Sequence, residues 1–196
     1  MTDNEIGIII LAAGASSRLG TPKQLLRFEG KTLLRRAVET AIETNYRIIV
    51  VLGANFERTK AEIEDLEIEI CFNKNWQDGM SSSLKTGLKK LLEIAPNLSA
   101  VIITLCDQPF INSQVFNNLA ETFEKTNAPI VACNYAETIG VPALFSHLFF
   151  DELLNLSADE GARKIIKNHL AEVEKISVPQ AEIDIDTAED FQKLFI

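Results

Sequence analysis

Two positively charged side chains lie in a segment rich in small residues. Residues 11–24 read LAAGASSRLGTPKQ, in which Arg18 and Lys23 are the cations. Small residues let the backbone approach a ligand closely, and its N–H groups can bind an anion. A guanidinium group and an ammonium group both suit phosphate oxygens. The segment is therefore a candidate phosphate-binding loop in which Gly14 and Gly20 can take positive φ. The alternative is an ordinary loop with two solvated cations.

A carboxylate follows an apolar run further along the chain. Residues 101–105 read VIITL, and Asp107 comes just after them. A carboxylate at the end of a strand is well placed to hold Mg²⁺, which takes one or two carboxylates together with phosphate oxygens. Such an ion can clamp a triphosphate and polarise its α-phosphorus. A capping Asp is the alternative, but Asn112 and Ser113 are nearer to the next helix. Asp107 is therefore a candidate metal ligand.

A second acidic segment lies near the end of the sequence. Asp184 and Asp186 alternate with isoleucines, so both side chains point to one face if the segment is extended. Two like charges on one face are costly unless a cation or water meets them. Asp184 and Asp186 are therefore candidates for a second metal ligand, and the alternative is a solvated acidic strand end. Thr187 and Asp190 have the spacing of a capping box.

Three serines open a segment with helical periodicity. Residues 78–84 read DGMSSSL, and leucines recur on one face as far as residue 94. Serine at the start of a helix is most simply a cap. That role explains one serine well and three less well, which leaves room for a second role for this segment.

Alternating strands and helices must position these groups. Short apolar runs predict strands at 6–11, 48–52, 68–72, 100–105, 129–133, 142–145 and 173–178. Residue spacing predicts helices at 32–44, 81–94, 113–125, 160–168 and 188–195, and a polar helix at 57–65. Strands that are apolar throughout indicate a mostly parallel sheet covered on both faces. The prediction is a single-domain, Rossmann-like α/β sandwich of three layers, spanning residues 1–196, with its site at the carboxyl ends of the strands.

Composition narrows the classes of partner. The chain has 196 residues, 46% of them hydrophobic, and a formal net charge of -9. An acidic surface repels nucleic acid and anionic lipid, so neither is expected as a partner. The first residues lack the basic start and long apolar core of a signal peptide, so a cytoplasmic protein is expected. Cys71, Cys106 and Cys133 are expected to be buried, reduced thiols.

The pattern LAAGxSxRxGxxK after a first strand resembles a known signature. It is similar to the loop of the nucleotidyltransferases that include the molybdenum cofactor guanylyl- and cytidylyltransferases and the methylerythritol-phosphate cytidylyltransferases, which have a nucleotide-diphospho-sugar transferase fold. The resemblance implies that Arg18 and Lys23 hold the triphosphate as pyrophosphate leaves, and that Asp107 and Asp186 hold Mg²⁺. It implies that the nucleotide contacts come from these residues: Leu11, Ala12, Ala13, Gly14, Gly79, Ser83 and Asp107.

Further segments resemble one branch of this family. Leu-Ala-Ala-Gly goes with cytidine in the family, and GMSSSL, GVPALF and ADEGAR resemble the molybdenum cofactor cytidylyltransferases. The resemblance implies transfer of CMP from CTP to the terminal phosphate of molybdenum-loaded molybdopterin, with a molybdoenzyme or its chaperone as recipient of the product. Val141 departs from the His or Asn that many relatives carry there. Arg163 is a candidate for an acceptor phosphate, or for a surface pair with Asp159.

Other interpretations stay open. A cytidylyltransferase for another phosphorylated acceptor, such as methylerythritol phosphate, shares the loop, and an accessory protein could hold a nucleotide or cofactor without turnover. The loop matches neither GxGxxG nor GxxxxGK[ST], and the second strand ends at Leu52 without an acidic residue, which disfavours a dinucleotide-dependent reductase. His147 and His169 are isolated and expected to be structural, and Trp76 is expected to be a packing residue.

Overall fold

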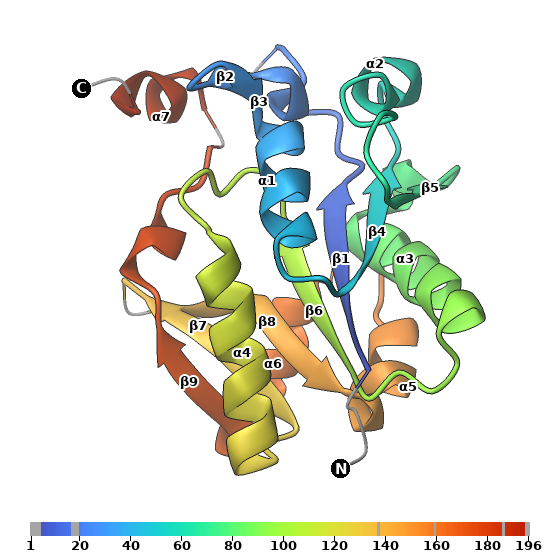
Figure 1. Ribbon diagram of the computed structural model, residues 1–196, viewed down its shortest axis with the longest axis vertical. Helices are drawn as coiled ribbons and strands as arrows, with labels where there is room; N and C mark the ends of the chain where they lie inside the picture. The colour runs from blue at the N-terminus through green and yellow to red at the C-terminus, as the bar shows by residue number, and fades with distance from the viewer. Residues whose placement is uncertain (1–4, 17–19, 137, 159, 186, 195–196) are drawn as a thin grey trace.

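A mostly parallel sheet forms the centre of the molecule (Figure 1). The computed structural model describes residues 5–16, 20–136, 138–158, 160–185 and 187–194. Within them, seven strands pair in the order β5-β4-β1-β6-β8-β7-β9. Only β8 runs antiparallel to its neighbours in this sheet. The strands are β1 (Ile6–Ala12), β4 (Arg47–Leu52), β5 (Glu69–Phe72), β6 (Ala100–Leu105), β7 (Ile130–Tyr135), β8 (Thr138–Ser146) and β9 (Val173–Ser177).

Helices cover both faces of this sheet. Figure 1 shows α1 and α4 on the near face, with α3, α5 and α6 on the far face. The helices are α1 (Leu33–Ile42), α2 (Phe56–Lys60), α3 (Met80–Ile94), α4 (Ser113–Thr126), α5 (Phe150–Leu154), α6 (Ala162–Asn168) and α7 (Ala188–Lys193). A short antiparallel pair, β2 (Arg27–Phe28) and β3 (Lys31–Thr32), lies apart from the main sheet.

The period of two along each strand divides the core into two layers. On β1, Ile8 and Ile10 pack in one buried cluster with α1 and α4, whereas Ile9 and Leu11 pack in the other with α3, α5 and α6. All four side chains are less than one-tenth exposed. A strand buried on both faces must be apolar throughout, which is why the sequence shows runs rather than alternation. The predicted three-layer α/β fold is confirmed.

Most expected elements are present, with some corrections. All seven predicted strands form, although β8 extends beyond the predicted 142–145. The helix expected over 57–65 ends at Lys60 and continues as turns. The β2–β3 pair and α5 were not predicted, because two-residue strands and a five-residue helix carry too little periodicity. Asn112 caps α4, and Thr187 with Asp190 forms the expected capping box.

The three cysteines are free thiols, as expected. Cys106 and Cys133 are buried, and burial raises the pKa of each thiol to about 12. Cys71 is only half-buried, which corrects the expectation for that residue. Within the described part of the chain, no helix has the length and apolar character needed to cross a membrane.

His169 makes stability depend on pH. Its ring nitrogens lie 2.9 Å from Glu172 Oε1 and 3.0 Å from Glu152 Oε2, and the hydrogen bond to Glu172 is the main reason that the pKa of His169 is raised. A raised pKa contributes stability that is complete below the unfolded value, near 6.5, and is lost as pH rises through the folded value. We expect His169→Gln to lower Tm by about 1–3 °C at pH 6 and by less at pH 8.5. Thermal melts at the two pH values measure this, and an equal loss at both would contradict it.

Candidate active site

The two candidate segments leave neighbouring strands at the same level. β1 and β6 are parallel partners, and Leu11 lies opposite Leu105 in their register. The loop that follows β1 and the turn that carries Asp107 therefore begin side by side. This is the carboxyl edge of the sheet, where open α/β folds bind ligands.

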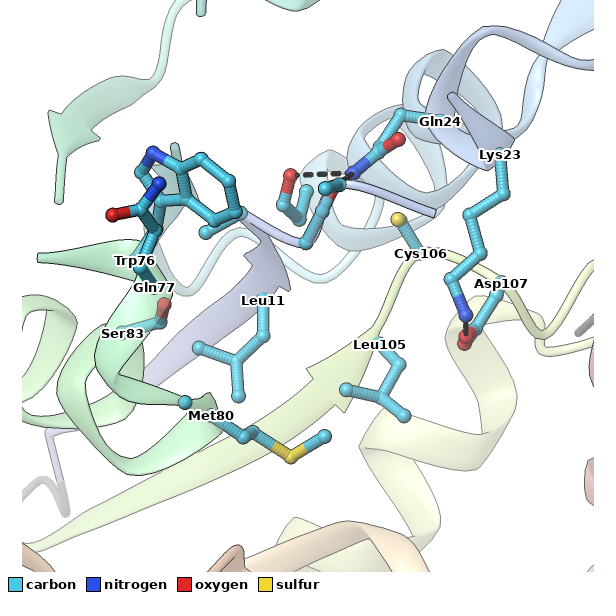
Figure 2. Close-up of a pocket in the computed structure, with 15 residues that line it drawn as sticks. Leu11, Lys23, Gln24, Trp76, Gln77, Met80, Ser83, Leu105, Cys106 and Asp107 are labelled. Carbon is cyan, nitrogen blue, oxygen red and sulfur yellow. Dashed lines mark hydrogen bonds and ion pairs between the residues drawn. The ribbon is translucent and has the colours of Figure 1, made fainter. Parts of the chain in front are cut away.

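A cavity of about 320 Å³ opens between them. Figure 2 shows Lys23 and Asp107 on one side of it and Trp76, Gln77 and Ser83 on the opposite side, with Leu11 and Leu105 between. The cavity therefore has a charged end and a polar end separated by an apolar floor. Its lining consists of Leu11, Ala12, Ala13, Gly14, Ala15, Lys23, Gln24, Trp76, Gln77, Gly79, Met80, Ser83, Leu105, Cys106 and Asp107.

Lys23 and Asp107 form an ion pair at the charged end. Lys23 Nζ donates to Asp107 Oδ2, although the two residues are 84 positions apart in the chain. Asp107 is only 5% exposed, and its Oδ1 is buried without a hydrogen-bond partner among the described residues. A buried carboxylate with one oxygen that accepts no hydrogen bond can bind a metal ion through that oxygen. The structure thus brings together two of the predicted site residues.

Gln24 shapes the loop that precedes it. Its side chain is 1% exposed, and Nε2 donates to Ala12 O at 3.0 Å and to Gly14 O at 2.7 Å. Ser16 Oγ donates to Gln24 Oε1 at 3.4 Å and accepts the N–H of Lys23 at 2.9 Å. These bonds hold the described part of the loop, residues 12–16, against Lys23 and Gln24.

The loop presents donors rather than acceptors to the cavity. The carbonyl of Ala13 accepts the N–H of Ala54 at 2.9 Å, so the carbonyls of Ala12, Ala13 and Gly14 are all engaged. The backbone N–H groups of residues 14–16 donate to no described residue. Such an arrangement suits anionic oxygens. The contact with Ala54 requires glycine at position 53, where a Cβ would lie 2.7 Å from Ala13 O.

The glycines of the loop differ from each other. Gly20 has φ of 67°, as the sequence allowed, whereas the backbone of Gly14 is not in the positive-φ region. A Cβ added at Gly14 would meet no atom within 4 Å. Glycine at 14 therefore leaves open space beside the cavity rather than permitting a special turn. Positive φ is found instead at Ser16, with φ of 55°.

The serines that open α3 are not helix caps, which corrects the simplest sequence interpretation. The N-cap is Gly79, with φ of 95°, and no side chain caps the helix. Asn73 Nδ2 donates to Ser82 Oγ at 2.8 Å and to Ser83 Oγ at 2.9 Å. Ser81 Oγ instead donates to Ala158 O at 3.0 Å. The bond from Asn75 N–H to Asn73 Oδ1 fixes the orientation of the Asn73 amide. Because Ser83 accepts from Asn73, its own proton is left to donate into the cavity.

A second cavity adjoins the first. It has a volume of about 210 Å³ and shares Leu11, Met80 and Leu105 with the larger cavity, so the two are contiguous. Gly161 lies close to Met80, since a Cβ there would be 3.0 Å from the Met80 sulfur. The lining of the second cavity is Leu11, Met80, Ile103, Leu105, Gln108, Tyr135, Gly140, Val141, Gly161, Ala162, Arg163 and Asp184.

The C-terminal acidic segment is anchored beside Asp107. Ile185 is fully buried, and its N–H donates to Asp107 O at 3.1 Å. Asp184 is exposed and lines the second cavity, so Ile185 points inward and Asp184 outward. Arg18 and Asp186 lie outside the described residues, and so does Asp159, the proposed partner of Arg163.

Of the other residues singled out in the sequence, Arg163 and Trp76 each line one of the two cavities, whereas the two histidines line neither. Arg163 donates to Thr138 Oγ1 at 3.3 Å and lines the second cavity. Trp76 packs on the core and also lines the first cavity. His147 is exposed, and His169 lies among carboxylates on the protein surface. Among the described residues, no three His, Cys, Asp or Glu side chains gather in a way that could hold a metal ion.

Sequence reasoning missed the buried amides of Gln24, Asn73 and Gln108. Each is less than one-tenth exposed and donates two hydrogen bonds that shape a cavity wall. A signal was available, because each amide directly follows a residue that ends a strand or carries a charge. Polar residues at such places must find partners if they are buried.

Comparison with known proteins identifies the family. Residues 8–173 match the model of the MobA-like NTP transferase domain. The chain belongs to the MobA-like NTP transferase family. The matched range includes the loop after β1, Asp107, and strands β6, β7 and β8, which contribute residues to the two cavities. The resemblance seen in the sequence is therefore confirmed at the level of the family.

Several known proteins are similar to this chain over most of its length. A nicotine blue oxidoreductase of Paenarthrobacter nicotinovorans is 28% identical over 196 residues, covering 95% of this chain and 94% of that protein. The crystal structure of Rv0371c from Mycobacterium tuberculosis H37Rv has a TM-score of 0.85 at 28% identity, covering 99% of this chain and 98% of that one. Rv0371c in complex with manganese has a TM-score of 0.80 at 25% identity, covering 97% of both chains.

Similarity to a molybdenum cofactor enzyme is less extensive. A probable molybdenum cofactor guanylyltransferase of Methanosarcina acetivorans is 33% identical over 125 residues. The match covers 61% of this chain and about half, 52%, of that protein. The comparisons therefore establish a nucleotidyltransferase family and its fold.

Proposed function

We propose that residues 1–196 form one Mg²⁺-dependent cytidylyltransferase domain that acts in the cytoplasm. It transfers CMP from CTP to the terminal phosphate of molybdenum-loaded molybdopterin and releases pyrophosphate. A molybdoenzyme or its chaperone then receives the product. The observation that carries this proposal is the Lys23–Asp107 pair at the charged end of a cavity whose loop offers N–H groups.

The chemistry needs positioning and charge neutralisation more than a protein nucleophile. An oxygen of the acceptor phosphate attacks the α-phosphorus of CTP, and the bond from that phosphorus to the bridging β-oxygen breaks. Pyrophosphate leaves with the electron pair of that bond. Lys23 and the loop N–H groups lie where they can meet the triphosphate oxygens, and Arg18 is proposed to share this role. Charge that develops on the leaving group is stabilised by such fixed donors.

Asp107 fits the role of a Mg²⁺ ligand. Its Oδ1 is buried without a described partner, and Lys23 occupies Oδ2. When bound, the ion would clamp the triphosphate and polarise the α-phosphorus. Asp186 is proposed as the second carboxylate that binds Mg²⁺. The position of Ile185 supports this, because Ile185 is buried and its N–H donates to Asp107 O. The manganese complex of Rv0371c supports a divalent ion in this family.

Hydrogen-bond polarity favours cytosine over guanine. Ser83 has a proton to donate, and the carbonyls of Ala12 and Gly14 are already engaged by Gln24. A wall that donates suits a base edge with adjacent acceptors, such as O2 and N3 of cytosine. The corresponding edge of guanine carries N–H donors, which such a wall leaves unpaired at a cost of about 1–3 kcal/mol each. The Leu-Ala-Ala-Gly sequence supports the same choice.

The second cavity is the proposed place for the acceptor. It shares Leu11, Met80 and Leu105 with the nucleotide cavity, so an acceptor there lies next to the α-phosphate. Arg163 can meet a phosphate, and Val141 offers an apolar surface to a flat ring. Methylerythritol phosphate is the alternative acceptor, and a non-catalytic nucleotide- or cofactor-holding role is the alternative without turnover.

An oxidoreductase is a second candidate, favoured by one observation. The relative from Paenarthrobacter nicotinovorans that aligns over 95% of this chain is named a nicotine blue oxidoreductase. The lack of GxGxxG disfavours a Rossmann dinucleotide site, but it does not address another mode of nucleotide binding.

Pyrophosphate release distinguishes these candidates. The assay contains Mg²⁺ and CTP, GTP, ATP or UTP, each with and without molybdenum-loaded molybdopterin. We expect release with CTP that requires the pterin. Release only with methylerythritol phosphate would replace the acceptor, and release with GTP would replace the nucleotide. Nucleotide binding without release, together with oxidation of NADH or NADPH by a dye, would replace the proposal with a reductase.

Gln24 should control nucleotide affinity. Gln24→Leu keeps the approximate size of the side chain but removes the two hydrogen bonds to the carbonyls of Ala12 and Gly14. The loop is then no longer held in the conformation that binds the nucleotide. We expect Kd for CTP to rise by about tenfold, since one unsatisfied carbonyl costs about 1–3 kcal/mol. Titration calorimetry measures the change. The control is Gln114→Leu on α4, where the exposed amide donates a hydrogen bond to Asn118. Similar affinities for both variants would contradict the role.

A further inference from the structure

The side chain of Gln108 joins segments that are far apart in the chain. Gln108 directly follows Asp107 and is only 7% exposed. Its Nε2 donates to Val141 O in β8 at 3.3 Å and to Ala181 O near the C-terminus at 2.9 Å. These bonds tie the wall of the second cavity, and the segment that carries Asp184, to the residue beside Asp107.

The Val141 carbonyl has a second donor. Tyr135 Oη in β7 donates to Val141 O at 3.2 Å, and burial raises the pKa of Tyr135, so the hydroxyl keeps its proton. Glycine at position 140 leaves room for this hydroxyl, because a Cβ there would lie 2.8 Å from Tyr135 Oη. Two side-chain donors on one carbonyl fix the peptide at the point where the wall meets the cavity. Gln108, Tyr135 and Val141 all line that cavity.

A small cavity also borders Gln108. Gln108 and Arg36 both line a cavity of about 10 Å³. Gln108 Oε1 and Arg36 Nε are both buried and lack a partner among the described residues. A volume of this size is about that of one water molecule. Gln108 and Arg36 therefore both border a space that can hold one water molecule.

We propose that Gln108 is a positioning residue for the acceptor. It holds the second cavity, through Val141 O and Ala181 O, at a fixed place relative to Asp107. It therefore sets the affinity for the acceptor and leaves nucleotide affinity to the loop braced by Gln24. The acceptor part of this inference rests on the proposed function, whereas the mechanical part rests only on the hydrogen bonds.

Gln108→Leu and Gln24→Leu form a matched pair of variants, each replacing a buried amide by an apolar group of similar size. For Gln108→Leu we expect KM for molybdenum-loaded molybdopterin to rise by about tenfold, with Kd for CTP within about twofold of the parent. For Gln24→Leu we expect the larger change in Kd for CTP. An increase in Kd for CTP as large in Gln108→Leu as in Gln24→Leu would overturn the proposal.

Hydrogen exchange tests the mechanical part without an acceptor. Ile185 N–H bonds to Asp107 O, so loosening the segment near Ala181 should expose it. We expect exchange in a peptide covering 181–185 to be at least about fivefold faster in Gln108→Leu, and unchanged in Gln24→Leu. Unchanged exchange in Gln108→Leu would overturn the proposal, whether or not the parent protein transfers a nucleotide. Failure of the parent to transfer a nucleotide would refute only the proposed function.

A milder variant covers a failure of Gln108→Leu to fold. Tyr135→Phe removes one of the two donors to Val141 O and leaves the bond from Gln108 to Ala181 intact. We expect a rise of about two- to threefold in KM for the pterin, with unchanged Kd for CTP. No change in the KM of a folded Tyr135→Phe would contradict control of the acceptor through this carbonyl.

Discussion

Replacement of Asp107 by Asn should lower the rate of pyrophosphate release by at least about 10³-fold, equivalent to about 4 kcal/mol of transition-state stabilisation. Asn is nearly isosteric but lacks the charge that attracts Mg²⁺ and neutralises Lys23. The residue is 5% exposed and follows the end of β6, so its packing is largely kept by Asn. Stopped or steady-state assays with saturating CTP and acceptor measure the change in kcat.

Asp65→Asn is the matched control for this change. Asp65 also pairs with a cation, Arg35 at 2.8 Å, but it lies on the surface and lines neither cavity. We expect its kcat to match that of the parent. Comparable rates for Asp107→Asn and Asp65→Asn would remove Asp107 from the reaction, whereas a melting temperature that falls by more than about 10 °C in Asp107→Asn would assign the residue to folding instead.

Replacement of Lys23 by Met should lower kcat by about 10²- to 10³-fold, because a fixed cation at the leaving phosphates supplies about 3–4 kcal/mol. Met keeps an unbranched chain of similar length without the ammonium group. Lys31→Met is the control, since Lys31 pairs with Glu39 at 2.6 Å on the surface. A Lys23→Met variant with full kcat and only a raised KM for CTP would show uniform binding of the nucleotide rather than stabilisation of the transition state.

The same variant tests the metal assignment without turnover. Lys23→Met leaves the buried Asp107 carboxylate without the ammonium group at Oδ2, and a buried charge that loses its partner destabilises the fold. Mg²⁺ alone should then recover part of the lost Tm, because the ion can take the place of the ammonium group. The double variant Lys23→Met, Asp107→Asn should show no such recovery. An equal response to Mg²⁺ in both would contradict coordination by Asp107.

The sequence was sufficient for the sheet because burial on both faces leaves a simple pattern. Runs such as 8–11 and 101–103 are apolar throughout, and only a parallel sheet between two helical layers buries them fully. The paired positions of Leu11 and Leu105 follow from that topology, and with them the proximity of the loop and Asp107. The ion pair with Lys23 could be inferred only in outline, since it depends on how the loop folds back.

Features set by individual hydrogen bonds were beyond the sequence. Ser81 and Ser83 have the composition of helix caps, yet Gly79 is the N-cap and the serines bond to Ala158 and Asn73. The choice depends on a strand end that lies nearby only in the folded chain. Contiguity of the two cavities likewise depends on Met80, which lines both and lies close to Gly161. Local propensity contains no information about such contacts.

Transfer of the α-phosphate is the central claim, and labelled CTP tests it most directly. The protein is incubated with Mg²⁺, molybdenum-loaded molybdopterin and CTP labelled with ³²P at either the α- or the γ-position, and the pterin product is separated. We expect label in the pterin product from α-labelled CTP only, with the γ-label in pyrophosphate. Label in the pterin from γ-labelled CTP would show phosphoryl transfer, and no label from either would show that no phosphorus-containing group passes from CTP to the pterin. Both results would contradict a nucleotidyltransferase acting on this acceptor.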